Sequence, residues 1–289
     1  MSATRDADTT GVAFTGGAGR LAGDLWGGSG RAAVVLAHGG GQTRHSWRRT
    51  AADLHRQGHT VATFDARGHG DSDWSTAAEY SFDDLTGDLA DVVAQVRWRT
   101  GVGRPVLVGA SMGGIAALLA LAADPGLAAA LVLVDVTPKV EPDGVSRVHR
   151  FVTGAPNGFG DLDEVARAVS AYNPHRRTPA TPDGLRKNVR RGADGRWYWH
   201  WDPAFFQVRS DVTPIELQVR LERAARRIAV PTLLIRGTAS DIATDSGVAL
   251  LHRLIPHAVV ADVSGAGHMV AGDDNDVFAV ALRTFLDEL

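Results

Sequence analysis

The residues Gly109-Ala110-Ser111-Met112-Gly113 form a Gly-x-Ser-x-Gly pattern. A serine hydroxyl is a useful nucleophile only when it stands clear of the backbone on a tight turn, and flanking glycines let neighbouring backbone come close. Taken alone, such a pentapeptide is more often an ordinary turn. Here an apolar run at 105–108 precedes it and an apolar helical run at 115–123 follows it. We therefore predict that Ser111 is a nucleophile at a strand–turn–helix junction, with helix amides facing developing negative charge.

A nucleophilic serine needs a base, and the base needs an acid that orients it. In this strand–turn–helix context the chain order is serine, acid, histidine. Asp241 follows an apolar strand at 231–235, and His268 follows the last apolar strand at 258–263. Both residues are thus expected just past strand ends, as Ser111 is. We predict that Asp241 is the acid and His268 the base.

Each of these assignments has an alternative. Asp135 directly follows another apolar strand, at 130–134, and is the second candidate for the acid. If Asp135 is not the acid, it is a structural residue at the root of the following segment. Asp241 alone is equally compatible with a helix cap or a turn, and His268 alone with a loop histidine. Their order and their places at strand ends favour the catalytic interpretation.

Acyl transfer also needs two backbone N–H groups that stabilise the tetrahedral oxyanion. Met112, which follows the serine, supplies one of them. The loop His38-Gly39-Gly40-Gly41 (the glycine loop) follows an apolar strand and supplies the other. We predict the N–H of Gly40, with Gly41 as the alternative. His38 is expected to order this loop, and His38 and Gly41 are candidates for contact with the substrate.

Apolar strands alternate with amphipathic helices over most of the chain, which predicts an α/β fold with a mostly parallel central sheet and helices on both faces. Residues 12–26 alternate in a turn-rich pattern and are expected to form an antiparallel hairpin at the sheet edge. This alternation of strands and helices stops after Pro138 and resumes near residue 230. We expect a core of 1–137 and 230–289, interrupted by a helical insert at 138–229 that covers the site as a cap or lid.

The insert carries an aromatic run, Trp197-Tyr198-Trp199-His200-Trp201. Its tryptophans Trp197, Trp199 and Trp201 are candidates for a substrate-facing wall that favours apolar or aromatic groups. A small core of the insert itself accounts for them equally well.

At this point the chain resembles the α/β-hydrolase superfamily, in its capped branch of epoxide-hydrolase-like and haloperoxidase- or esterase-like proteins. The residues that carry the resemblance lie in five stretches in order: 38–47, 65–72, 109–114, 237–241 and 265–268. The resemblance implies an α/β-hydrolase fold and a Ser-His-Asp hydrolase without a cofactor. Relatives that open epoxides or cleave haloalkanes use an aspartate nucleophile, and Ser111 stands in that place here. The 65–72 stretch is expected to be a structural turn.

The 289 residues are 44% hydrophobic and 22% charged, with a net charge of −3. These values are ordinary for a globular protein and offer no basic surplus for nucleic acid or an anionic membrane. The chain has no cysteine, which excludes disulfides and cysteine-ligated zinc, and no histidine spacing suggests a metal site. Since the N-terminal residues lack a signal-peptide pattern, we expect a cytoplasmic protein.

The function that we predict is a cofactor-independent serine hydrolase of the carboxylesterase type. It would cleave an ester or related acyl bond of a small apolar or aromatic substrate. A C–C bond hydrolase, a lactonase or a perhydrolase would use the same residues, and a non-catalytic ligand-binding protein is the alternative outside enzymes. We expect this protein to bind a small-molecule substrate and to bind neither nucleic acid nor a membrane. The sequence is compatible with a monomer or a homodimer.

Overall fold

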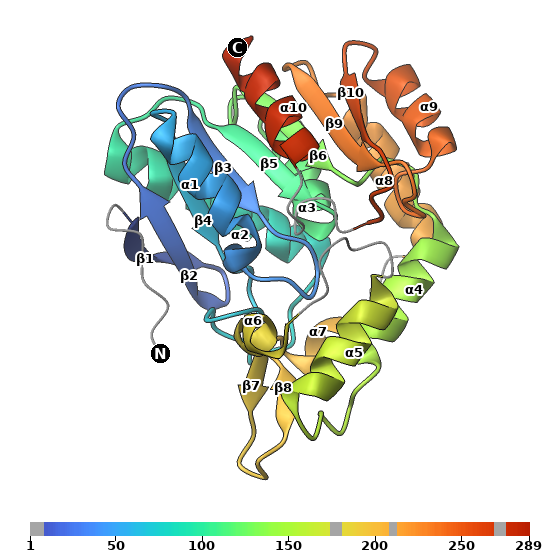
Figure 1. The fold of residues 1–289 in the computed structure, drawn as a ribbon. Coiled ribbons are helices and arrows are strands. Elements are labelled where there is room, and N and C mark those ends of the chain that lie inside the picture. Colours follow the sequence, from blue (N-terminus) through green and yellow to red (C-terminus); the bar gives the residue numbers. More distant parts are fainter. Residues whose placement is uncertain (1–8, 174–180, 208–212, 269–275) are drawn as a thin grey trace.

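The computed structural model describes residues 9–173, 181–207, 213–268 and 276–289. At its centre is an eight-stranded sheet with the strand order β1-β2-β4-β3-β5-β6-β9-β10 (Figure 1). The strands are β1 (Thr9–Gly16), β2 (Gly19–Trp26), β3 (Ala33–Ala37), β4 (Thr60–Phe64), β5 (Val106–Ala110), β6 (Ala130–Val134), β9 (Thr232–Gly237) and β10 (Val259–Val263). β1 and β2 form the predicted antiparallel edge hairpin, and the strands from β4 to β10 are parallel. The predicted fold class is confirmed.

Helices cover both faces of the sheet because its central strands are apolar on both sides. Every residue of β3, β4, β5 and β6 is buried, as expected for parallel strands between two helical layers. One layer holds α2 (Phe82–Thr100), α3 (Met112–Ala123), α8 (Pro214–Ala225) and α9 (Asp245–Leu254). The other holds α1 (Arg48–Arg56), which follows the short helix η1 (Arg44–Trp47), and α10 (Asp276–Asp287).

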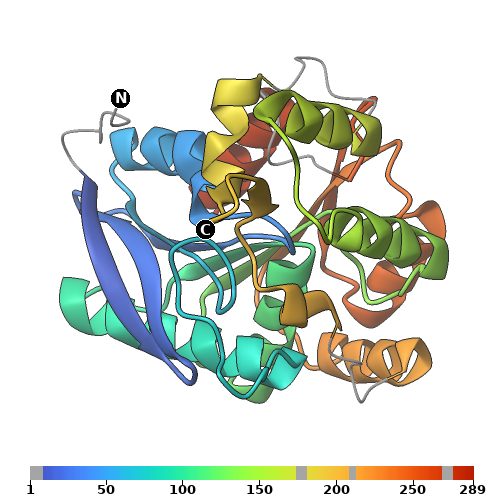
Figure 2. The ribbon, with the colours of Figure 1, turned by 90° about the horizontal axis from the view of Figure 1, so that it is seen from below.

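Most of the segment between β6 and β9, but not its last helix, lies below the carboxyl ends of the strands and outside the two helical layers (Figures 1 and 2). It contains α4 (Pro142–Thr153), α5 (Leu162–Tyr172), α6 (Pro182–Leu185), η2 (Arg186–Asn188), β7 (Val189–Arg191), β8 (Trp197–Trp199) and α7 (Pro203–Gln207). We call the elements from α4 to α7 the cap. The cap has its own apolar cluster, which includes Val152, Val165 and Trp199.

Two details of the cap differ from the sequence prediction. Helix α8 lies within the predicted insert, but its buried residues Leu221, Ala224 and Ala225 belong to the main core, so this helix packs with the sheet layer. The insert also contains a small antiparallel hairpin of β7 and β8. Strands of three residues are too short to show a reliable alternating pattern in the sequence. Within the described residues, no helix is both long and apolar enough to cross a membrane.

Candidate active site

Ser111 lies on the sharp turn between β5 and α3 that the sequence predicts. Its backbone has φ 46° and ψ −113°, in the positive-φ range that non-glycine residues rarely adopt. A Cβ on Gly113 would lie 2.5 Å from the carbonyl oxygen of Ala37, so only glycine allows α3 to begin this close to β3. Strain of this kind is concentrated at functional sites, where the surrounding structure maintains it.

Asp135 occupies the equivalent position on the neighbouring strand. Ala110 and Val134 are register partners at the ends of β5 and β6, and the Ser111 N–H donates to the Val134 carbonyl at 3.0 Å. Ser111 and Asp135 are therefore the first residues beyond two paired strand ends. Asp135 also has a positive φ, 49°, and its side chain is 1% exposed.

His268 is hydrogen-bonded to this buried carboxylate: its Nδ1 lies 2.7 Å from Oδ2 of Asp135. The same carboxylate accepts the Gly237 N–H at 3.0 Å and the Ser240 hydroxyl at 2.5 Å. A carboxylate with these donors is held in one orientation. A carboxylate oxygen accepts hydrogen bonds, so this contact fits the tautomer of His268 in which Nδ1 carries the proton and Nε2 can accept one.

The structure does not pair Asp241 with His268, contrary to the sequence assignment. Asp241 lies four residues beyond the end of β9, where Arg147 of α4 binds both of its oxygens at 2.6 and 2.5 Å. Helix α4 approaches the loop closely, because a Cβ on Gly144 would lie 2.5 Å from the Asp241 carbonyl. The hydrogen bonds from Arg147 hold the pKa of Asp241 below its usual range. The acid on the histidine is the alternative candidate, Asp135.

The glycine loop is held by its own backbone and side chains. The Gly39 carbonyl accepts Nδ1–H of His38 at 2.8 Å and the Gln42 N–H at 3.1 Å. The Gly39 N–H in turn donates to Oε1 of Gln42 at 3.0 Å. The Gly39 carbonyl and the Gly40 N–H belong to one planar peptide unit, so fixing the carbonyl also fixes the direction of the N–H.

The N–H groups of Gly40 and Gly41 differ in their hydrogen-bond partners. The Gly41 N–H already donates to Nε2 of His69 at 3.1 Å, whereas the described residues provide no acceptor for the Gly40 N–H. A Cβ on Gly40 would lie 3.8 Å from Sδ of Met112, which places the loop beside the start of α3. The first N–H groups of a helix lack intrahelical partners, and Met112 is the first residue of α3. This geometry favours Gly40 over Gly41.

His38 is not presented to a substrate. Its side chain is buried, its Nδ1 donates to Gly39, and its Nε2 accepts the Ala66 N–H at 2.9 Å. Burial lowers the pKa of His38, as expected for an imidazole that must accept a backbone hydrogen bond. The structure thus supports the expectation that His38 orders the glycine loop and gives it no free nitrogen for substrate contact.

The three tryptophans belong to the apolar cluster of the cap. Trp199 and Trp201 are buried and stacked, with ring centroids 4.8 Å apart, and Trp197 packs against the same cluster. Trp201 also reaches the glycine loop, where a Cβ on Gly41 would lie 3.3 Å from its ring. Phe206 contacts the same loop one residue earlier, since its ring would lie 3.5 Å from a Cβ on Gly40. Phe206 follows the aromatic run together with Phe205, and nothing in the sequence pattern distinguishes the two.

A family model described as the alpha/beta hydrolase fold matches residues 32–274. The chain belongs to this family. An esterase from Mycobacterium tuberculosis, Rv0045c, is 30% identical over 286 residues, which cover 93% of this chain and 87% of the relative. A 2-(acetamidomethylene)succinate hydrolase from Mesorhizobium japonicum is 27% identical, with 79% of this chain and 78% of the relative covered.

Solved structures agree with this family assignment. The crystal structure of an alpha/beta hydrolase from Novosphingobium aromaticivorans matches with a TM-score of 0.82 and 25% identity, covering 99% of this chain and all of the other. The relatives of this α/β-hydrolase chain are esterases and hydrolases, which supports a hydrolase role.

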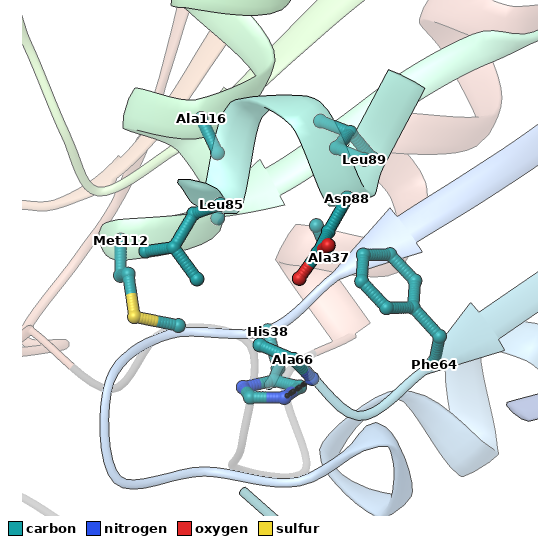
Figure 3. Close-up of a pocket in the computed structure, with 10 residues that line it drawn as sticks. Ala37, His38, Phe64, Ala66, Leu85, Asp88, Leu89, Met112 and Ala116 are labelled. Atoms are coloured by element: carbon teal, nitrogen blue, oxygen red, sulfur yellow. Dashed lines mark hydrogen bonds between the residues drawn. The ribbon is translucent and has the colours of Figure 1, made fainter. Parts of the chain in front are cut away.

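In this α/β-hydrolase a small cavity of about 20 Å³ lies behind the glycine loop, between β3, α2 and α3 (Figure 3). Its volume suits one water molecule. His38 and Asp88 line it, but both nitrogens of His38 are already bonded, and Asp88 is bonded to Arg67 and to the Gly17 N–H. We therefore regard this cavity as a small gap in the packing and not as a binding site. In the described part of the chain, no group of three or more acidic or histidine side chains is arranged to hold a metal.

Proposed function

We propose that this protein is a cofactor-independent serine hydrolase that cleaves an ester or related acyl bond through an acyl-enzyme on Ser111. The observation that carries the proposal is the hydrogen bond from His268 to Asp135, because Asp135 lies at the strand end next to Ser111. A strained serine, an oriented imidazole and an unused loop amide are the parts that acyl transfer requires.

In the proposed reaction, Oγ of Ser111 attacks the acyl carbon while Nε2 of His268 takes the hydroxyl proton. The N–H groups of Gly40 and Met112 stabilise the tetrahedral oxyanion. His268 then gives the proton to the leaving alcohol, and the acyl group remains on Ser111. Water attacks the acyl-enzyme in the same way, with His268 as the base, and releases the acid. Asp135 orients the imidazole and stabilises its charged form.

The surroundings of the glycine loop favour a small apolar or aromatic substrate. Phe206 lies over Gly40, and the side chain of Met112 lies beside it. Within the cap, Tyr172 stacks on Phe151 with ring centroids 4.1 Å apart, and the Arg147 guanidinium that lies over Tyr172 is bound by Asp241. Because this cation is already paired with Asp241, it offers no free charge to an anionic substrate.

The test is the Ser111→Ala variant, assayed with p-nitrophenyl acetate and labelled with a fluorophosphonate probe. We expect kcat to fall by about 10³-fold or more, and the covalent label to disappear. Ser170→Ala is the matched control, because Ser170 is an exposed serine on α5, and it should keep wild-type turnover and labelling. Full turnover by Ser111→Ala would contradict the proposal.

A substrate panel separates the reactions that share this mechanism. Esters of increasing acyl length, lactones and β-diketones would be compared with and without peroxide. We expect the highest kcat/KM for short or aromatic acyl esters. Absence of fluorophosphonate labelling at Ser111 in the wild type, together with no turnover of any member of the panel, would instead favour a binding protein.

A further inference from the structure

The cap is seated on the 65–72 turn of the core by direct hydrogen bonds. The Asp202 N–H donates to the Gly68 carbonyl at 2.8 Å, and the Gly70 N–H donates to Nδ1 of His200 at 2.8 Å. Arg190 also donates to the Gly70 carbonyl. The sequence predicts this turn as a purely structural element, but here it is also the surface on which the cap rests.

The same turn holds the glycine loop through His69. Nε2 of His69 accepts the Gly41 N–H at 3.1 Å, and its Nδ1 lies 3.1 Å from the Arg67 carbonyl, to which it donates. The His69 ring lies 5.9 Å from the His200 ring, centroid to centroid. A continuous set of contacts therefore runs from the cap through two buried histidines to the loop.

The peptide between Gly40 and Gly41 depends on this support. Gly41 has φ +71°, a conformation that glycine adopts freely but does not prefer over others. The Gly41 N–H is held by His69, and Trp201 and Val152 of the cap crowd the position where a Cβ would lie, at 3.3 and 3.2 Å. The Gly40 N–H belongs to the preceding peptide, whose Gly39 carbonyl accepts the Gln42 N–H across this turn at 3.1 Å. A rotation of the peptide between Gly40 and Gly41 would open the turn and break that hydrogen bond, so the Gly40 N–H would lose one of the contacts that fix its direction.

We propose that His69, backed by His200 of the cap, is a positioning residue that keeps the Gly40 N–H aimed at the oxyanion, so that the seated cap completes the oxyanion hole. The proposal rests on the serine-hydrolase function above. It assigns to the cap an effect on the rate of acyl transfer in addition to any effect on substrate binding.

Both histidines must be neutral in this arrangement, because each accepts a backbone N–H. Burial lowers the pKa of His69 well below its usual value, and the nearby His38 and His200 lower it further. Burial also lowers the pKa of His200 to about 3, with His38 and Arg190 acting in the same direction. The environment of both side chains therefore maintains the accepting form.

The test compares His69→Leu with His69→Gln, whose amide can still accept at the position of Nε2. An oxyanion donor acts in the transition state more than in the ground state, so its loss lowers kcat and leaves KM nearly unchanged. For p-nitrophenyl acetate we expect His69→Leu to lower kcat by about 10- to 100-fold, with KM within about threefold, and His69→Gln to recover most of the loss. His200→Leu should show a smaller loss of the same kind, about 3- to 10-fold, which His200→Asn restores.

His59→Leu is the matched control, since His59 is also a buried histidine but lies at the amino end of β4, away from the site. It should keep wild-type kcat. If His69→Leu does not fold, His69→Asn replaces it, because its shorter amide does not reach Gly41. Wild-type kcat in folded His69→Leu or His69→Asn, a change in KM alone, or a His69→Gln variant as slow as His69→Leu would overturn the proposal.

Ser111→Ala, assayed in parallel, keeps the two proposals apart. If Ser111→Ala is inactive while the His69 variants are normal, only the positioning proposal fails. If Ser111→Ala retains full turnover, the serine mechanism fails, and the positioning proposal fails with it.

Discussion

Two aspartates follow neighbouring strands at the same edge of the sheet, and the structure uses them in opposite ways. Asp135 is 1% exposed, has a strained backbone and binds His268. The Asp241 side chain is 42% exposed and binds Arg147 of the cap. One carboxylate is built into the candidate active site, whereas the other joins the cap to the core. The position of a residue directly after a strand is fixed by the strand itself. The position of a residue four places later depends on the path of the loop.

The largest expected effect is a difference in kcat between variants of the two aspartates. Asp135→Asn should lower kcat by about 10³- to 10⁴-fold, because an amide no longer stabilises the charged imidazole or selects its tautomer. Asp241→Asn should stay within about fivefold of wild type, because that side chain touches no group in the proposed reaction. The measurement is kcat and KM on one activated ester at a fixed pH.

Asparagine is a suitable substitute at position 135 for a structural reason. It tolerates positive φ better than most residues, so the variant tests chemistry and leaves the backbone conformation in place. Circular dichroism and thermal unfolding would confirm that both variants are folded. Equal losses for the two variants, or a larger loss for Asp241→Asn, would contradict the assignment of the acid to Asp135.

The sequence alone predicts most of the fold and part of the site. Apolar runs and their spacing place the sheet, its edge hairpin and the turn at Ser111, because burial on both faces leaves a clear pattern. No such pattern indicates which of Asp135 and Asp241 binds His268. It depends on a positive φ at 135 and on Arg147, which approaches from a helix about 90 residues away in the chain. Similarly, the sequence predicts only that His69 lies in a turn, and its contact with Gly41 is seen only in the structure.

A second comparison, between Asp241 and the buried His200, uses the pH dependence of stability. The pKa of Asp241 is already below its usual range, so this residue is ionised in both folded and unfolded protein above about pH 5 and adds no slope there. The buried His200 behaves differently, since its folded pKa is about 3. Below pH 6.5 the unfolded chain binds a proton at this histidine that the folded chain does not, so stability falls as the pH falls.

The expected contribution of His200 is up to about 1.4 kcal/mol per pH unit below pH 6.5. Chemical denaturation at pH 7, 6 and 5 would measure the slope in wild type, His200→Asn and Asp241→Asn. We expect His200→Asn to have a shallower slope and Asp241→Asn to match wild type. The groups that act on His200 include His38, Arg190 and Asp71, and none of them is altered in either variant. A slope that changes in Asp241→Asn alone would reverse the interpretation.

The smallest expected effect concerns salt. The side chains of Arg147 and Asp241 are 33% and 42% exposed, and ion pairs with such exposure contribute about 1 kcal/mol or less to folding. In 1 M salt the Debye length falls to about 3 Å, so the coupling energy between Arg147→Met and Asp241→Asn should shrink toward zero. A double-mutant cycle in 0.05 M and 1 M NaCl measures this coupling.

A coupling that stays the same in high salt would mean that the Arg147–Asp241 pair is sealed from solvent as Asp135 is. Such a pair would be a fixed part of the site, and the contrast between the two aspartates would disappear. A coupling that salt removes, together with unchanged kcat, places Asp241 in the attachment of the cap. In that case high salt should loosen α4 from the core without affecting the hydrogen bond between Asp135 and His268, whose side chains are 1% and 7% exposed.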